Sequence, residues 1–219
     1  AFGSSVALSE NYAAVAAPRE DEVGIGDDTG WIYIFDTSDG SLLHSIKNPN
    51  IDAEDEYPGD QLGGRVQTLA MNDTYTVVGS WRENTAGATG GGDSGAIHII
   101  TNSTGAVQTI LNPNPNGPAI GTDNFDQFGY SVDISGNYII VGAPGEDIDG
   151  TNSGNAFIYE LSGGSWTLLR RLSNPNAYNT VNNDYFGSEV AINGSYCAVA
   201  AQDEDTAAGQ SSGIVYIFS

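Results

Sequence analysis

Cysteine, histidine and basic residues are scarce in this chain, and each scarcity removes a class of function. The 219 residues include one cysteine, two histidines and six basic residues against 28 acidic ones, which gives a formal net charge of −22. A single cysteine excludes an intrachain disulfide. A surface this negative repels nucleic acid, anionic membranes and acidic polymers unless cations intervene, so no nucleic-acid partner is expected.

Long apolar runs are also missing. No apolar stretch reaches the roughly 18 residues of a membrane-spanning helix, so direct membrane insertion is not expected. No signal peptide opens the chain, and the absence of an initiator methionine before Ala1 indicates a processed or excised segment. The 29 glycines and the 39% hydrophobic content are typical of a turn-rich all-β domain, in which Cys197 is expected to be a small core residue.

A repeated pattern dominates the sequence. An opening motif of a large apolar residue, glycine and a later valine recurs at Phe2–Val6, Leu62–Val66, Phe128–Val132 and Phe186–Val190. Apolar runs that begin with tyrosine follow each opening, at residues 12–18, 75–81, 138–144 and 196–202. Within these runs, Val15, Val78, Val141 and Val199 share one offset and are predicted to occupy equivalent buried positions.

Each unit continues with a third apolar run that follows a glycine, at residues 30–35, 95–100, 154–159 and 213–218. The first three units add a fourth run that ends in Asn-Pro-Asn, whereas the last unit stops before it. Four short strands per unit predict an all-β fold, a β-propeller of four-stranded antiparallel blades over residues 2–61, 62–127, 128–185 and 186–219. The blades could close as a four-blade ring or belong to a larger, seven-bladed one.

The third unit carries both halves of a named motif, Phe128-Gly129 and Gly142-Ala143-Pro144. With these residues the chain resembles the FG-GAP repeats of integrin α-subunit propellers, and the other units keep a degraded form of the motif. That resemblance implies a calcium loop of the type Asp-x-Asp-x-Asp-Gly between the first two strands. Here the link is a tight turn such as Ser135-Gly136-Asn137, predicted three residues longer in the second unit, so the integrin-type calcium loop is not expected.

Acidic residues concentrate on one side of the predicted propeller. Because strands alternate in direction, the connections between strands two and three, and between strand four and the next blade, lie on the same face. Most of the 28 acidic residues fall on these longer connections. Long loops commonly carry function, so we expect binding at this acidic long-loop face, with the alternative that the charge only keeps a surface protein soluble.

Two sets of side chains on this face are candidate sites. Acidic triplets follow the second strand, and Ca²⁺ prefers carboxylate and carbonyl oxygens; the candidate ligands are Glu20, Asp21, Glu22, Glu146, Asp147, Asp149, Asp203, Glu204 and Asp205. The alternative for these acidic triplets is that their side chains are solvated and bind no ion. Asp60, Asp126 and Asp184 each precede an opening and are expected to accept a backbone N–H in the turn. The aromatic candidates for ligand binding are Tyr57, Trp81, Tyr178 and Tyr185.

Catalysis is not expected. His98 aligns with Tyr33, Phe157 and Tyr216, and His44 aligns with Gln108 and Arg170, so both histidines have structural explanations. The sequence therefore favours an extracellular adhesion or recognition module, at a cell or virion surface, that binds a protein or glycan with help from divalent cations. The alternatives are a structural repeat module of an appendage, envelope or virion that contacts neighbouring subunits, and an accessory part of a polysaccharide-degrading enzyme.

Overall fold

The computed structural model describes residues 2–20, 30–49, 62–65, 67–83, 93–114, 125–175, 180–207 and 209–219, and these residues form fifteen strands and no helix. The first sheet holds β1 (Ser5–Leu8), β2 (Tyr12–Ala17), β3 (Trp31–Asp36) and β4 (Leu42–Lys47). The second holds β5 (Leu69–Met71), β6 (Tyr75–Ser80), β7 (Ala96–Thr101) and β8 (Val107–Leu111). The third holds β9 (Ser131–Ser135), β10 (Tyr138–Ala143), β11 (Asn155–Ser162) and β12 (Ser165–Ser173), and the fourth holds β13 (Phe186–Asn193), β14 (Tyr196–Ala201) and β15 (Ile214–Phe218).

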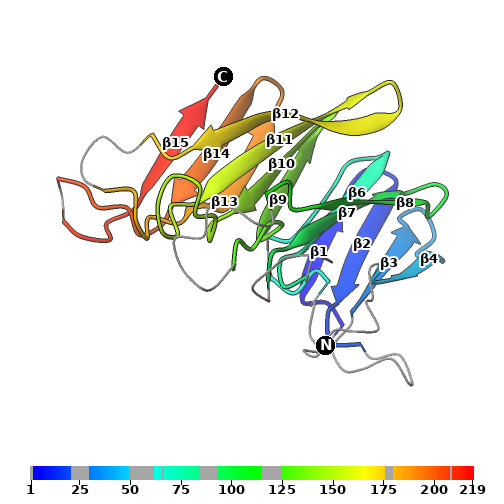
Figure 1. Cartoon of the computed structure of the whole chain (residues 1–219). Coiled ribbons are helices and arrows are strands. Elements are labelled where there is room, and N and C mark those ends of the chain that lie inside the picture. Colours follow the sequence, from blue (N-terminus) through cyan, green and yellow to red (C-terminus); the bar gives the residue numbers. More distant parts are fainter. Residues whose placement is uncertain are drawn as a thin grey trace.

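Each sheet is a simple antiparallel meander, with its strands side by side in chain order. The four sheets stand next to one another as the blades of a propeller-like arc, with β4 and β15 toward opposite ends (Figure 1). Between the described strands, the extensive contacts join consecutive blades only. The expected fold class is confirmed, and among the described residues the blades form an open arc and not a closed four-blade ring.

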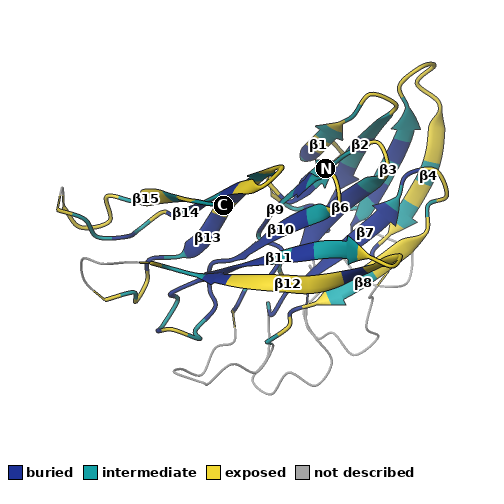
Figure 2. Cartoon of the chain, turned by 90° about the horizontal axis from the view of Figure 1, so that it is seen from above, coloured by how far each residue is buried: buried dark blue, intermediate teal, exposed yellow. Residues whose placement is uncertain are grey.

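The first strands of the blades lie innermost and, together with residues of β14 and β15, line a cavity of about 560 Å³ on the concave side of the arc. Its walls include Val6 of β1, Leu69 of β5, Val132 of β9 and Val190 of β13. The outer strands β4 and β12 are mostly exposed, whereas the middle strands are mostly buried (Figure 2). This gradient explains why β6 and β10 have near-continuous apolar sequences, since both of their faces are covered.

The strand registers confirm the alignment of the repeat. Val15, Val78, Val141 and Val199 lie opposite Tyr33, His98, Phe157 and Tyr216, respectively. Val78, Val141 and Val199 are fully buried, as expected. The expectation is wrong for Val15, which is only half-buried because it lies on the face of the first blade that no described blade covers.

The second blade corrects one detail of the alignment. Leu69, and not Val66, lies opposite Val78, at the position that Val132 holds opposite Val141. The turn between β5 and β6 is as short as the one between β1 and β2, so the three additional residues do not lengthen it. They precede β5 instead, where the Thr68 hydroxyl donates a hydrogen bond to the Arg65 carbonyl oxygen (2.7 Å).

The two halves of the repeated motif meet where consecutive blades touch. A Cβ atom on Gly142, in the third blade, would lie 2.0 Å from the carbonyl oxygen of Gly187 in the fourth. Gly79 of the second blade has the same relationship with Gly129 of the third, at 1.9 Å. These contacts leave no room for a side chain, so glycine is required at Gly79 and Gly142 for the blades to approach this closely.

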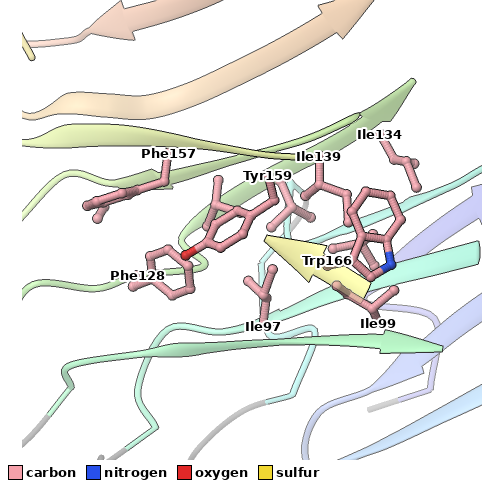
Figure 3. Packing of buried hydrophobic residues seen from close by; sticks show 12 residues of the cluster. Ile97, Ile99, Phe128, Ile134, Ile139, Phe157, Tyr159 and Trp166 are labelled. Carbon is pink, nitrogen blue, oxygen red and sulfur yellow. The ribbon is translucent and has the colours of Figure 1, made fainter. Parts of the chain in front are cut away.

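Apolar side chains fill the spaces between the blades. The space between the second and third blades contains Ile97 and Ile99 from β7 against Phe128, Phe157 and Tyr159 (Figure 3). Similar clusters join the first blade to the second and the third to the fourth, and the last of these includes buried Cys197, as expected. The burial of these apolar faces therefore stabilises the contacts between neighbouring blades.

Candidate functional site

The long-loop face is built from the connections that follow the second and fourth strand of each blade. All strand pairs are antiparallel, so these connections emerge on one side, and the tight turns such as 9–11, 136–137 and 194–195 lie on the other. In each blade an acidic residue of this face lies three residues beyond the end of β2, β6, β10 or β14. This topology places the candidate residues on a common surface.

One glutamate in each blade shapes the start of this face. Glu20, Glu83, Glu146 and Glu204 follow the second strand at the same offset. In each case the glutamate N–H bonds the carbonyl oxygen of the last residue of that strand, and its own carbonyl oxygen accepts the N–H of the glycine before the third strand. For Glu146 these two bonds are 3.2 Å, to Ala143, and 2.9 Å, from Gly154. The glutamates therefore belong to a recurring turn.

The carboxylates of this series point inward to hydrogen-bond donors. The hydroxyl groups of Tyr33 and Tyr216 donate to Glu20 (2.6 Å) and Glu204 (2.5 Å). The side-chain amide of Asn48 donates to Glu83 (3.1 Å), and that of Asn114 donates to Glu146 (2.9 Å). Sequence reasoning treated three of these glutamates as metal ligands, whereas the structure gives them hydrogen-bonding roles inside the fold. Their recurrence at one offset in all four units was the signal for such a role.

Asp126 and Asp184 accept hydrogen bonds from the side-chain amides of the Asn-Pro-Asn segments. Asn112 donates to Asp126 and Asn174 donates to Asp184, both at 2.9 Å, and both aspartates are buried. These two bonds link the end of the fourth strand to the next blade. Asp60 lies outside the described residues.

Asp126 and Glu146 form a buried acidic pair between the second and third blades. Desolvation raises the pKa of Glu146 to about 8 and that of Asp126 to about 7. Repulsion from Asp126 and Asp147 adds to the pKa shift of Glu146, and repulsion from Asp147 adds to that of Asp126. The second carboxylate oxygen of Glu146 is buried without a described hydrogen-bond partner. The pair is therefore more stable when it retains protons.

The fully described acidic triplets do not gather around one point. Within the first of them, Asp147 accepts the N–H of Asn152 (2.6 Å), Asp149 lies 3.8 Å from Arg171, and Glu146 is turned inward. In the second, Asp205 accepts the N–H of Ser211 (2.8 Å), while Glu204 binds Tyr216. No group of three or more His, Cys, Asp or Glu side chains in the described ranges is arranged to hold a metal ion. Asp21 and Glu22 lie outside those ranges.

An aromatic and basic cluster, which we call the Trp81–Tyr130 cluster, lies on the long-loop face. The rings of Trp81 and Tyr130 are 5.8 Å apart and nearly perpendicular. The Arg65 guanidinium lies 3.8 Å from the centre of the Tyr130 ring, and that of Arg82 lies 4.8 Å from the Trp81 ring. The Trp81 indole N–H is buried without a hydrogen-bond partner in the part of the chain that the structure describes.

Of the two predicted aromatic ligand residues that the structure describes, Trp81 belongs to this cluster and Tyr185 does not. Trp81 was predicted, whereas Tyr130, Arg65 and Arg82 were not. Tyr185 lies at the start of β13, where its N–H bonds the Asn152 carbonyl oxygen (3.1 Å) and its φ is +53°. Tyr57 and Tyr178 lie outside the described residues. Tyr130 could not be selected from the recurring residues of the opening motif, because a tyrosine occurs at this position in one unit only.

The histidines lie where the alignment placed them. His98 is buried, its Nδ1 atom lies 2.9 Å from the Thr109 hydroxyl, and desolvation lowers its pKa to about 3. His44 lies opposite Ile34, in register with Gln108 and Arg170 of the other blades. A buried neutral histidine that replaces an aromatic residue fits a packing role.

The fold and the repeated turns define a propeller-type protein built from blade repeats. The FG-GAP repeat family matches residues 1–35, 119–159 and 175–218. The chain therefore belongs to the FG-GAP repeat family. No curated protein matches the chain closely enough to be reported as a relative. Among the described residues, no helix has the length and apolar character needed to cross a membrane.

Proposed function

We propose that the chain is an extracellular recognition module, exposed at a cell or virion surface, that binds a glycan or protein ligand through its long-loop face and catalyses no reaction. The observation that carries this proposal is the Trp81–Tyr130 cluster. It joins two aromatic rings and two guanidinium groups on the face where long connections gather. Such loops, supported by a rigid scaffold, are common places for binding residues.

The repeat itself indicates that the fold does not need this cluster. Where the third blade has Tyr130, the other openings have Ser4, Gly64 and Ser188. Where the second blade has Trp81, the others have Pro18, Pro144 and Gln202. At each of these two positions, three blades form the same turn without a large aromatic residue. The two exceptions, Trp81 and Tyr130, contact each other. Departures from a repeat that converge at one point favour a role in binding.

The chemistry of the cluster favours a glycan over a protein ligand. Tryptophan and tyrosine rings offer apolar faces with polar edges, and a sugar ring can stack on such a face. The neighbouring guanidinium groups can donate hydrogen bonds to sugar hydroxyl groups, and the net charge of −22 disfavours an acidic sugar, so a neutral sugar is the preferred class. Arg82 lies 3.9 Å from Asp93, and Arg65 interacts electrostatically with Glu189, so each guanidinium group already faces a carboxylate.

A glycan array tests this proposal. The labelled chain is applied to an array of neutral, amino and uronic-acid oligosaccharides, and bound sugars are then measured by calorimetry. Replacing Trp81 with Ala, or Tyr130 with Ser, should weaken binding about fivefold or more, because one stacked ring contributes about 1 kcal/mol or more. Tyr196→Ser is the matched control, because Tyr196 is exposed at the short-turn side. Binding to no sugar, or equal loss in the control, would overturn the glycan proposal.

A structural role is the second candidate, and a separate observation favours it. Large apolar side chains are exposed at both ends of the arc, including Phe2, Val6 and Ile217. A repeat module of an appendage, envelope or virion would cover such residues with its neighbours in the assembly.

A further inference from the structure

Two residues of opposite charge occupy the same position of the repeat, in the blades on either side of Tyr130. The fourth residue of the opening motif is Arg65 in the second blade and Glu189 in the fourth, whereas the first and third blades have serine there. Strand β9, which follows Tyr130, contacts both β5 and β13, so the openings of these three blades lie side by side. Three departures from the repeat thus gather along consecutive blades.

The three side chains interact with one another. The Arg65 guanidinium lies 3.8 Å from the centre of the Tyr130 ring. Glu189 borders the same cavity as Gln67, which follows Arg65 by two residues, so Glu189 lies close to this segment. Electrostatic interactions link Glu189 with both Arg65 and Tyr130. The Trp81–Tyr130 cluster therefore extends to the fourth blade, which contributes a carboxylate.

The Trp81 ring has a similar pair of charges beside it. The Arg82 guanidinium lies 4.8 Å from the centre of this ring, and its Nε atom lies 3.9 Å from a carboxylate oxygen of Asp93. The side chains of Arg82 and Asp93 are 44% and 22% exposed, so a ligand on the ring can reach both. Each aromatic ring of the cluster is thus accompanied by one guanidinium group and one carboxylate.

We propose that Glu189 and Asp93 accept hydrogen bonds from sugar hydroxyl groups and thereby make the site selective for neutral sugars. This inference rests on the proposed glycan-binding function and names the residues that set its specificity. A hydroxyl group both donates and accepts, so a guanidinium group beside a carboxylate satisfies it in both roles. A uronic acid would place its carboxylate beside Glu189 and Asp93. The ammonium group of an amino sugar would meet Arg65 and Arg82, so both charged classes face a like charge.

The alternative for Glu189 and Arg65 is an ordinary surface ion pair. Exposed ion pairs contribute little to stability, so Glu189→Gln should leave the melting temperature nearly unchanged in either case. Desolvation raises the pKa of Glu189 despite the nearby Arg65, and a carboxylate with reduced access to water gains from hydrogen bonds that a ligand donates. Ligand selectivity, and not stability, therefore distinguishes the two roles.

Calorimetric titration with defined tetrasaccharides tests the inference. The neutral probes are cellotetraose, mannotetraose and galactotetraose, the acidic probe is tetragalacturonic acid, and the basic probe is the glucosamine tetramer. Glu189→Gln should weaken binding of the best neutral probe about tenfold or more, because it removes a charged hydrogen-bond acceptor. The same variant should bind tetragalacturonic acid more tightly than the wild type does, because Arg65 then faces no carboxylate. Asp93→Asn should have the same two effects through Arg82.

Glu160→Gln is the matched control. It also removes one negative charge, but Glu160 lies at the short-turn side, where it accepts a hydrogen bond from the Tyr138 hydroxyl (3.1 Å). This variant should leave every affinity unchanged. Circular dichroism checks folding, and Asp93→Asn decides if Glu189→Gln misfolds.

The outcomes separate this inference from the proposed function. A wild type that binds none of the probes would overturn both. A wild type that binds a neutral probe, with an affinity that Glu189→Gln leaves unchanged or that the control also loses, would overturn this inference alone. A wild type that prefers a charged probe would do the same.

Discussion

Gly142 of β10 packs directly on the carbonyl group of Gly187, with the Cα of one blade against the backbone of the next. The relationship explains why the family motif has two separated glycines. The glycine of the second half of the motif in one blade meets the glycine of the first half in the following blade, as Gly79 and Gly129 also do. The motif therefore encodes the spacing between blades, and a single blade considered alone gives no reason for it.

Alanine at Gly142 should destabilise the protein. The added methyl group would overlap the Gly187 carbonyl oxygen, and overpacking of this kind typically costs about 1–3 kcal/mol in the free energy of unfolding. Urea denaturation measures the loss. Gly136→Ala is the control, because Gly136 has open space around it and a φ of +58°, so alanine there adds only backbone strain. If Gly142→Ala lost no more stability than Gly136→Ala, the contact would not matter.

A charge in the centre of a blade should unfold the domain. Val141 is fully buried between the second and third blades, and an unpaired carboxylate in its place costs several kcal/mol, which is comparable with the total stability of a domain. Val141→Asp should therefore lose the cooperative melting transition seen by circular dichroism. Val107→Asp, at a partly exposed position of β8, should keep it. Wild-type melting of Val141→Asp would show that the blade alignment is wrong.

Stability should fall as the pH rises through the neutral range. The pKa of Glu146 rises from 4.5 to about 8, and that of Asp126 from 3.8 to about 7, so the folded protein binds more protons than the unfolded chain between these values. The stabilisation is complete below about pH 4 and is lost as the pH approaches 8. Urea midpoints from pH 4 to 9 measure this slope. Glu146→Gln should flatten it, and an unchanged slope in that variant would rule out the pair as its source.

Calcium should raise the melting temperature if cations act at the long-loop face. Asp147 and Asp149 have separate partners, so an ion would have to draw them together, and its binding free energy would then stabilise the folded state. We expect a higher melting temperature in millimolar CaCl₂ than in NaCl of equal ionic strength. Asp147→Asn together with Asp149→Asn should abolish the difference. A melting curve that calcium leaves unchanged would show that the acidic triplets are solvated charges and not a calcium site.

The repeat made much of the fold predictable from sequence, because burial between blades imposes the same pattern four times. Val78 and Val141 were placed correctly for this reason, and His98 was recognised as a packing residue. The side-chain network was not predictable in the same way. Glu146 and Asp126 resemble solvated acids until the neighbouring blade covers them, and their burial depends on a contact that no single unit contains. Likewise, Trp81 and Tyr130 come into contact only because the second and third blades pack against each other.

The restriction of extensive contacts to consecutive blades has a consequence for how the molecule opens. Stability in such an array is close to a sum of blade terms and nearest-neighbour terms, so local openings are cheapest at the two ends. Amide hydrogen exchange should accordingly be slowest in β6 and β10, whose blades are covered on both sides, and fastest in β3 and β15.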